Sequence, residues 1–377
     1  MFEKESSNQT RFFSDDSFDS FDDITILHHD EDFTISHVDP VDDDVEPNKP
    51  PPKVLIEVPE SKTVDLYLFH VHEEGPKLYL FCKHPVGSDY YTICIEITDS
   101  FYYLQFLPIQ GHEYEILDEV NFIAHKNGGS VISSEMKEFK YSFEIVQIPE
   151  VSNYLNVVLS STTNLSRIPP NGINYSHVFG LTTTLTENFY IRRNIKCPSW
   201  IRATNCEKKS RNTTVPMLTV PNIESIIPLD LPKTPPMNIC AISIRSMFHT
   251  NEIYMISLRV LQEWDIMEFS GSGNFALNLI CTTSGSKIND KFISENKKSV
   301  RAYRNESDLL SSFVRLIDDY DIDILTSFGL ISNDIPLLFS RLKLFNVKDW
   351  WRIGRLRRST PIKNGKINPN YALSGRI

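Results

Sequence analysis

The sequence predicts an α+β protein built from an acidic N-terminal tail, a β-rich domain and a second domain that mixes strands with helices. Three observations support this class. Residues 1–60 show no sustained apolar period, residues 64–161 alternate apolar and polar side chains, and residues 238–345 pass from strand-like runs to helical spacing. Because strands repeat every two residues and helices about every 3.6, such changes of period separate the parts of a chain.

Residues 1–60 are predicted to be a disordered acidic tail that ends in a proline linker. The first 50 residues hold 15 acidic and 3 basic side chains, a net charge of −12, within a chain whose total is −11. High charge with few apolar residues favours disorder, and PNKPPPK is typical of a linker. The rest of the chain is therefore nearly neutral.

One short stretch of the tail, FDDITIL, sets apolar side chains among acids. Such a cluster can fold onto a partner surface as a short helix, and an unstructured tail is the alternative. The residues that would make this contact are Phe21, Asp22, Asp23, Ile24 and Leu27.

The β-rich domain, residues 61–236, begins with a predicted hairpin. VDLYLFHV (64–71) and KLYLFCK (77–83) flank the turn EEGP. Further strands are predicted at 89–97, 101–109, 139–148 and 154–161. A helix is predicted within 112–129, because the following residues share one face: Ile116, Leu117, Val120 and Ile123.

The last domain, residues 237–377, follows the order β-β-β-α-β-α. Strands are predicted at 238–248, 252–262, 274–282 and 322–328, and helices at 306–320 and 333–345. Asn333 is the predicted N-cap of the last helix, with Pro336 in its first turn. Three antiparallel strands followed by alternating helix and strand is the order of the ribonuclease-H-like fold, which proofreading exonuclease domains share. We therefore expect a mixed sheet.

The composition indicates a globular protein in a reducing compartment. Hydrophobic residues make up 41% of the chain, and no apolar run is long enough to cross a bilayer. The six cysteines form no CxxC pair, which argues against a zinc site and favours buried thiols. We expect a soluble, intracellular protein with no membrane partner.

A two-metal exonuclease needs converging carboxylates, two of them as D-x-E on the first strand and a third at the start of the last helix. The D-x-E positions hold Ser243 and Arg245, and only Asp334 is in place. Serine is a poor ligand for Mg²⁺, and arginine repels a cation. We expect no catalytic residue, metal or cofactor in this chain, and we expect Asp321 and Asp323 to be solvated surface carboxylates.

The C-terminal end is basic and is a candidate nucleic-acid contact. Residues 348–377 hold eight basic side chains and one aspartate, a net charge of +7. Arginines bind phosphates, and tryptophans stack on bases. The candidates are Arg355, Arg357, Arg358 and Trp350, with Trp351 beside them. In the alternative, the tryptophans close a core and the arginines lie on its rim.

His177 and Trp200 also carry polar groups, but they lie in a β-rich region beside Phe179 and Pro198. We expect both side chains to have packing roles.

Four further stretches point to a known family. YDIDILTSFGLISNDIPLLFSRL (320–342) matches the second exonuclease motif of family B DNA polymerases. Residues 173–200, which end in IRRNIKCPSW, and residues 235–253, PPMNICAISIRSMFHTNEI, match an N-terminal block and a degenerate first exonuclease strand. DWWRIGRLRRS (349–359) resembles the W-S-x-I-G-R-x-R-R-S signature, with Trp351 in place of its first serine. In this order they resemble the catalytic subunits of eukaryotic DNA polymerase alpha.

The resemblance implies a nuclear enzyme that extends the RNA primers made by primase with deoxynucleotides. It implies primer-template DNA and RNA/DNA hybrid as substrates, and the primase subunits and the B subunit as partners. The implied exonuclease-like domain has lost its carboxylates, in agreement with Ser243 and Arg245. FDDITIL loosely resembles peptides that dock on a replisome hub.

The polymerase palm patterns D-F-x-S-L-Y-P-S and Y-G-D-T-D-S do not occur, and neither do the family's C-terminal cysteine clusters. We expect a fragment, a truncated gene model or one piece of a split protein, inactive alone, with Mg²⁺ belonging to the missing palm domain. Two alternatives stay open: a non-catalytic replication scaffold that binds DNA or proteins, and an active 3′–5′ exonuclease that depends on Asp334.

Overall fold

The computed structural model describes residues 61–140, 145, 146, 148–209, 213–282, 288–357, 362, 363 and 366–377. These residues belong to one compact unit. The tail, its FDDITIL stretch and Arg358 lie outside the described residues, so those predictions stay predictions. We call residues 61–236 the β-rich segment and residues 237–377 the exonuclease-like segment.

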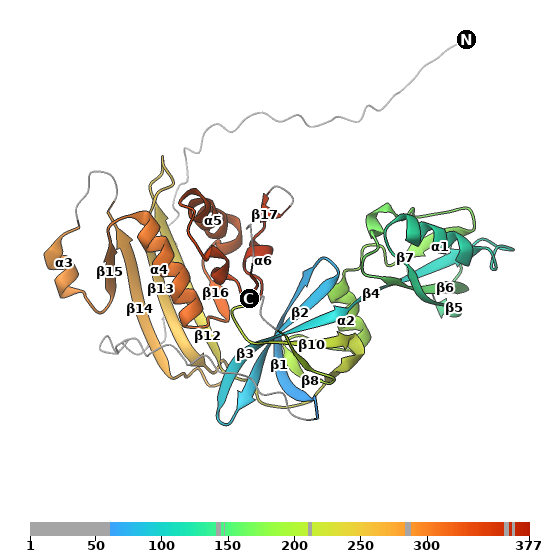
Figure 1. Cartoon of the computed structure of the whole chain (residues 1–377), viewed down its shortest axis with the longest axis horizontal. Helices are drawn as coiled ribbons and strands as arrows, with labels where there is room; N and C mark the ends of the chain where they lie inside the picture. Colours follow the sequence, from blue (N-terminus) through green and yellow to red (C-terminus); the bar gives the residue numbers. More distant parts are fainter. Residues whose placement is uncertain are drawn as a thin grey trace, which may run out of the picture. The chain divides into compact units, whose positions relative to one another are not determined.

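A seven-stranded sheet forms the centre of the β-rich segment, with strand order β11-β8-β1-β2-β3-β10-β9 (Figure 1). The predicted hairpin is confirmed: Glu74 pairs with Lys77, and Gly75 turns the chain with a φ of +56°. The strands are β1 (Val64–Glu74), β2 (Lys77–Val86), β3 (Asp89–Asp99), β8 (Ser199–Ala203), β9 (Glu207–Lys209), β10 (Met217–Asn222) and β11 (Ile226–Pro228).

One face of this sheet packs against helix α2 (Leu185–Arg193), which the sequence analysis does not predict. Leu185 and Phe189 are buried against the sheet, whereas Ile191 is 72% exposed, so the apolar stripe is too narrow to show a clear period. The helix begins at a capping box, in which Thr184 and Glu187 each accept a hydrogen bond from the other's backbone N–H.

The second sheet of the β-rich segment has the order β5-β6-β4-β7 and carries helix α1 (Ile116–Lys126) on one face. The predicted helix is confirmed. Of the strand predicted at 139–148, only Phe139 and Lys140 lie in an observed strand, β5, and residues 141–144 and 147 lie outside the described residues. The observed strands are β4 (Phe101–Pro108), β5 (Val131–Lys140), β6 (Val151–Ser160) and β7 (Tyr175–Phe179). Most side chains of β5 are exposed on both faces, so its pattern carries no alternation to read.

The exonuclease-like segment contains the predicted mixed sheet, in the order β15-β14-β13-β12-β16. Antiparallel ladders join β12 to β13 and β13 to β14, whereas β16 runs parallel to β12 and β15 parallel to β14. The strands are β12 (Met237–Ser246), β13 (Ile253–Trp264), β14 (Gly273–Cys281), β15 (Val300–Tyr303) and β16 (Ile324–Thr326). β15 and the short helix α3 (Asp290–Glu295) are additions to the predicted order.

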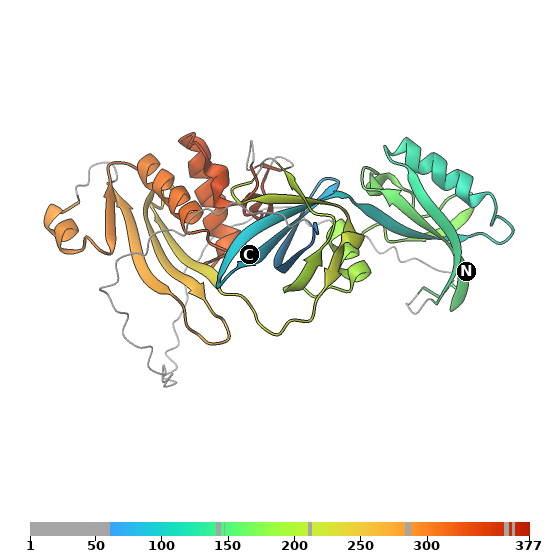
Figure 2. The same ribbon diagram turned by 60° about the horizontal axis from the view of Figure 1, so that its bottom comes forward.

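Helices α4 (Glu306–Asp319) and α5 (Ile335–Leu344) pack on this sheet and lie side by side above its strands (Figure 2). The predicted apolar face of α4 is confirmed, because Leu309, Leu310, Phe313 and Ile317 are all buried. A bidentate pair between Arg341 of α5 and Glu306 of α4, both largely buried, joins the two helices.

Asn333 is not the N-cap of α5, contrary to the prediction. Gly329 adopts a left-handed φ of +85°, and helical backbone begins directly after it with a π turn, Leu330–Asp334. Asn333 therefore lies inside a helical turn, with its N–H bonded to the carbonyl of Gly329 at 2.9 Å. Pro336 does lie in the first turn of α5, as predicted.

The last residues return to the sheet. A short 3₁₀ helix, Trp350–Ile353, precedes the small hairpin β17 (Ile362–Lys363) and β18 (Lys366–Ile367) and the helix α6 (Pro369–Ala372). Ile377 then donates to the carbonyl of Asp323 and accepts from the N–H of Leu325, which is the pattern of a parallel ladder with β16.

The predicted boundary at 236/237 falls between β11 and β12, where the chain passes from one sheet to another. The division into two domains at this point stays a prediction, because all described residues belong to one compact unit. No helix within the described part of the chain combines the length and the apolar character that a membrane span requires.

The core of the exonuclease-like segment should be sensitive to loss of volume at Phe313, which has 0% exposed area. We expect Phe313→Ala to lower the free energy of unfolding by about 3–5 kcal/mol through lost burial and a residual cavity. Urea unfolding followed by circular dichroism measures this change. The control is Phe122→Ala, because Phe122 is 68% exposed and its loss should change stability by less than about 0.5 kcal/mol.

Candidate functional site

The two D-x-E positions lie on the exposed face of β12. Ser243 and Arg245 are both exposed, two residues apart along the strand. β12 and β16 are parallel and pair as far as Ala241 and Thr326, so their carboxyl ends reach the same edge of the sheet. The start of α5 follows β16 directly, and this connection brings Asp334 to that edge.

The groups at this edge do not fit a pair of magnesium ions. Asp334 accepts a hydrogen bond from the hydroxyl of Ser327, and Ser257 and Met255 stand opposite Ser243 and Arg245 on β13. A single carboxylate, neutral hydroxyls and a guanidinium leave two divalent cations without neutralising ligands. Within the described ranges of the chain, no three His, Cys, Asp or Glu side chains are grouped to hold a metal ion.

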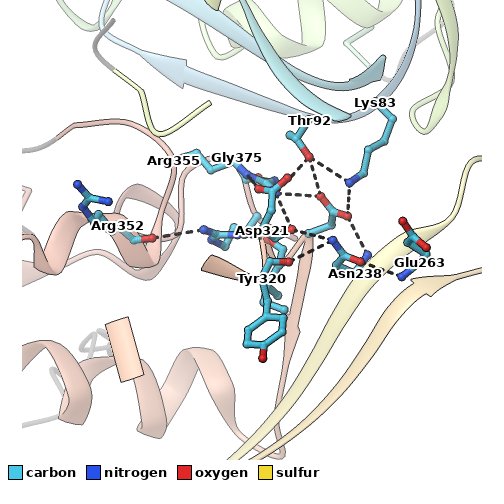
Figure 3. A network of polar contacts seen from close by, with 12 residues as sticks. Lys83, Thr92, Asn238, Glu263, Tyr320, Asp321, Arg352, Arg355 and Gly375 are labelled. Carbon is cyan, nitrogen blue, oxygen red and sulfur yellow. Dashed lines mark hydrogen bonds and ion pairs between the residues drawn. The ribbon is translucent and has the colours of Figure 1, made fainter. Parts of the chain in front are cut away.

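The prediction that Arg355 contacts nucleic acid is wrong. Its side chain has 0% exposed area and lies in a network of polar contacts (Figure 3). Nη2 lies 2.6 Å from Oδ1 of Asp321 and 2.9 Å from Oδ1 of Asp323. Nη1 donates to the carbonyl of Gly375 at 2.6 Å. A guanidinium enclosed in this way cannot reach a phosphate.

Asp321 and Asp323 are not solvated surface groups, contrary to the prediction. The side chain of Asp323 is 0% exposed and that of Asp321 is 26% exposed. Oδ2 of Asp323 lies 2.6 Å from Nζ of Lys83, on β2, and accepts from the N–H of Asn238 at 2.9 Å. We call Lys83, Asp321, Asp323 and Arg355 the charge cluster.

The hydroxyl of Thr92, on β3, lies at the centre of the charge cluster. It accepts from Nζ of Lys83 at 3.0 Å and donates to Oδ1 of Asp323 at 3.3 Å. It also lies 3.5 Å from Nη2 of Arg355. A single hydroxyl of the β-rich segment thus contacts both members of an ion pair in the exonuclease-like segment, Asp323 and Arg355.

The charges of the cluster support one another against the cost of burial. Burial alone would raise the pKa of Asp321, but Arg355, Lys83 and Arg376 outweigh it and hold that pKa well below its usual range. Burial lowers the pKa of Arg355, and Asp321 and Asp323 outweigh this effect and raise it. Both charges are therefore stabilised by their partners.

Asp321 holds its carboxylate in place through an unusual backbone conformation. Its φ is +44°, in the left-handed region that favours glycine. At this end of α4, the N–H of Asp321 bonds to the carbonyl of Asp318 and that of Ile322 to the carbonyl of Ile317. This pair of bonds is a Schellman motif, in which glycine is common at the position of Asp321. At this position the aspartate offers what glycine lacks, a side chain that pairs with Arg355.

Other arginines of the basic end are also directed inward. Nη1 of Arg352 lies 2.5 Å from Oδ2 of Asp318, whose side chain is 5% exposed. Arg376 is 3% exposed and donates to the carbonyls of Ile353 and Ile322. Burial, and next the charge of Arg355, lower the pKa of Arg376 to about 9. Three of the eight basic side chains of residues 348–377, those of Arg352, Arg355 and Arg376, are therefore neutralised or enclosed inside the protein.

Trp350 packs edge-to-face on Phe339, with ring centroids 5.7 Å apart, and contacts the apolar core, which supports the core interpretation. Trp351 is half-buried and lies under the guanidinium of Arg352 at 5.4 Å. Arg357 is exposed, so it stays a candidate for phosphate contact. Its neighbour Arg358 lies outside the described residues.

The two other singled-out residues have packing contacts. Trp200 is 7% exposed, donates from Nε1 to the carbonyl of Lys233 at 2.6 Å and packs on Tyr67. His177 is half-buried and stacks on Phe179, with ring planes 15° apart.

Sequence reasoning missed Lys83, Thr92, Asn238 and Arg376. A signal did exist for Lys83, because a lysine at the end of the apolar run KLYLFCK implies a buried partner if the strand is covered on both faces. The identity of that partner was not readable, since Asp323 is 240 positions further along the chain. Asn238 looked like an ordinary first residue of a strand, yet its amide bonds to the carbonyls of Tyr320 and Asp321.

Substitutions at Asp321 should separate the ion pair from the backbone conformation. We expect Asp321→Gly to lower the free energy of unfolding by about 1–3 kcal/mol, although glycine suits the left-handed φ. Asp321→Ala should be about 1 kcal/mol worse, because alanine also loses the left-handed preference. Urea titrations give the three values, and a glycine variant as stable as the parent would contradict a stabilising role for the carboxylate.

His70, near Arg355, should make stability fall with mild acid. Burial and the charge of Arg355 lower the pKa of His70 from 6.5 to about 4. A depressed histidine pKa means that the unfolded chain takes up the proton first, so its contribution is complete above pH 6.5 and is lost between pH 6.5 and about 4. Urea unfolding midpoints across this window should fall less steeply for His70→Gln; identical slopes would contradict this assignment.

Comparisons with known proteins agree with this geometry. The family model described as DNA polymerase family B, exonuclease domain, matches residues 176–376. The chain is similar to the DNA polymerase alpha catalytic subunit of Xenopus laevis, with 27% identity over 67% of this chain and 18% of the relative. The corresponding protein of Saccharomyces cerevisiae is 27% identical over 71% of this chain and 20% of the relative, and that of Mus musculus is 28% identical over 62% and 17%.

The chain thus spans about a fifth of the length of the curated relatives it matches. The family match covers more than half of the 377 residues and includes β12, β16, the Asp334 helix and the charge-cluster residues Asp321, Asp323 and Arg355. On this match, the chain belongs to DNA polymerase family B, through its exonuclease domain.

Proposed function

We propose that this chain is the N-terminal and exonuclease-like part of a replicative DNA polymerase of the alpha type, and that its exonuclease-like fold is architectural. The observation that carries the proposal is that the carboxylates of this segment pair with basic side chains. Ser243 and Arg245 replace the metal ligands of the first strand, while Asp321 and Asp323 neutralise Arg355 and Lys83 instead of a metal.

Electrostatics explains why this arrangement opposes phosphodiester cleavage. Two magnesium ions carry four positive charges and need several carboxylates close by. Arg245 adds a positive charge at the edge where Asp334 lies, and the Asp334 carboxylate already accepts a hydrogen bond from Ser327. We expect a water molecule at this edge to lack the pair of metal ions that activates it in a two-metal nuclease.

The proposed activity of the whole protein is extension of primase-made RNA primers with deoxynucleotides, in initiation and lagging-strand synthesis in the nucleus. The support is the similarity to relatives named as DNA polymerase alpha catalytic subunits. The proposed substrates are primer-template DNA and RNA/DNA hybrid, and the proposed partners are the primase subunits and the B subunit. The catalytic Mg²⁺ would belong to a palm domain, whose patterns D-F-x-S-L-Y-P-S and Y-G-D-T-D-S do not occur in this sequence.

The first test is a nuclease assay on the purified chain. A 5′-labelled single strand and a mismatched primer-template, incubated with Mg²⁺ or Mn²⁺, should keep their length. Asp334→Ala should behave like the parent, because there is no cleavage to lose. Shortening by the parent that Asp334→Ala abolishes would contradict the architectural role and establish an active exonuclease.

The second test uses the full-length protein that carries this segment. It should extend an RNA-primed DNA template with dNTPs and Mg²⁺ and should leave a mismatched 3′ nucleotide in place. The matched control lacks primer. Absence of extension from a matched primer would overturn the polymerase proposal and favour a replication scaffold that binds DNA or proteins.

A further inference from the structure

We propose that the charge cluster and Thr92 lock the exonuclease-like segment to the β-rich segment, so that the two unfold as one cooperative unit. On this view, Arg355 of the C-terminal arginine signature is a positioning residue inside the protein. The inference rests on contacts within the chain and does not depend on the proposed polymerase activity.

The lock joins three stretches that are distant in sequence. Lys83 and Thr92 come from adjacent strands β2 and β3, where Lys83 pairs directly with Thr92 in the antiparallel register. Asp321 and Asp323 come from the connection between α4 and β16. Arg355 follows the 3₁₀ helix Trp350–Ile353 and also bonds to the carbonyl of Gly375. Figure 3 shows Lys83 and Thr92 reaching toward the aspartates from the neighbouring sheet.

An apolar contact surrounds these charges. A buried cluster combines Tyr67, Phe69, Phe81 and Trp200 of the β-rich segment with two residues of the exonuclease-like segment, Met237 and Leu356. Leu356 is adjacent to Arg355 in sequence and is 3% exposed. The guanidinium of Arg355 itself lies 5.6 Å from the ring centroid of Phe69. Lys83, Asp323 and Arg355, with side-chain exposures of 3%, 0% and 0%, are therefore shielded from water, which strengthens their attraction and makes any misplacement costly.

The two kinds of contact have different consequences. Apolar burial is nondirectional and roughly proportional to area, so it would tolerate a small shift of one surface on the other. The charge cluster tolerates no such shift, because a displaced segment would leave Lys83, Asp323 or Arg355 buried beside apolar groups. We infer that the charge cluster allows only one packing arrangement of the two segments.

The backbone around the lock is arranged to hold it. Asp321 adopts its left-handed φ, and Asn238 of β12 bonds through its N–H to Asp323 and through its amide to the carbonyls of Tyr320 and Asp321. The oxygen of the same amide accepts from the N–H of Glu263. Asn238 thereby connects the turn at residues 320–323 to both β12 and β13. Loss of the charge cluster should therefore destabilise the whole sheet that contains these two strands.

Hydrogen exchange at increasing urea concentrations tests the lock on the intact chain. Peptides that cover β2 and β3 report on the β-rich segment, and peptides that cover β12 and β16 report on the exonuclease-like segment. In the parent chain, both sets should lose protection at the same urea concentration. In Thr92→Val, which keeps the shape but removes the hydroxyl, the β12 and β16 peptides should lose protection first and exchange at least about tenfold faster in the absence of urea.

For each set of peptides, the urea midpoint is the concentration at which half of the protection is lost. Arg355→Met should increase the difference between the midpoint of the β2 and β3 peptides and that of the β12 and β16 peptides. Arg355→Lys should reduce this difference again, because lysine restores the charge without the forked geometry. The matched control is Arg202→Met, since Arg202 pairs with Asp65 at side-chain exposures of 45% and 40%. That control should leave the two midpoints coincident and nearly unchanged.

A result in which Thr92→Val and Arg355→Met lower both midpoints together would overturn the inference, because the apolar contact would then suffice for cooperativity. Loss of protection confined to β2 and β3 in Thr92→Val would overturn it as well. Thr92→Val serves also as the milder variant if Arg355→Met fails to fold. None of these outcomes bears on primer extension, so failure of the lock and failure of the proposed function are distinguishable.

Discussion

Arg355 contacts two carboxylates that stand two residues apart in the sequence, Asp321 and Asp323, and much of the exonuclease-like segment is arranged around that contact. Asp321 turns into a left-handed conformation to reach the guanidinium, and Asp323 shares its two oxygens between Arg355 and Lys83. Buried ions of this kind are stable only when every partner is present, since each unpaired charge would face a medium of low polarizability. Three parts of the chain therefore depend on one another for their positions: the C-terminal residues, the turn after α4, and strands β2 and β3.

The same contact explains why arginines of the basic C-terminal end lie inside the protein. Residues 318–323 are acidic and residues 352–376 are basic, and the fold brings these two stretches together. Arginines that resemble a phosphate-binding surface in the sequence are thus counter-ions for aspartates that resemble metal ligands. Each group of charges explains the other, and their mutual neutralisation leaves exposed Arg357 as the described member of the arginine signature that stays available to a polyanion.

The exonuclease-like segment has a complete framework but lacks the D-x-E pattern on its first strand. The parallel pairing of β12 with β16, the packing of α4 and α5 and the approach of Ile377 to β16 are all present. At the edge itself, Ser243, Arg245 and the Ser327-bound Asp334 offer hydrogen bonding and positive charge instead of clustered carboxylates. A framework of this kind is stabilised by its apolar core, which is independent of the groups at the edge, so the fold does not require carboxylates there.

Local patterns in the sequence were sufficient for the first hairpin, for helices α1, α4 and α5, for strands β12 to β14 and β16, and for the absence of D-x-E on the first strand of the exonuclease-like segment, because period, turn residues and side-chain type act over a few positions. They failed for α2, whose apolar stripe is two residues wide, and for β5, which is exposed on both faces. They also failed for Arg355, Asp321 and Asp323, since a charged side chain looks the same in sequence whether water or a distant ion neutralises it. Lys83 and Thr92 lie more than 200 positions from Asp323, and the Thr92 contact spans 231 positions, so only the long-range packing of the folded chain could show that these charges belong inside.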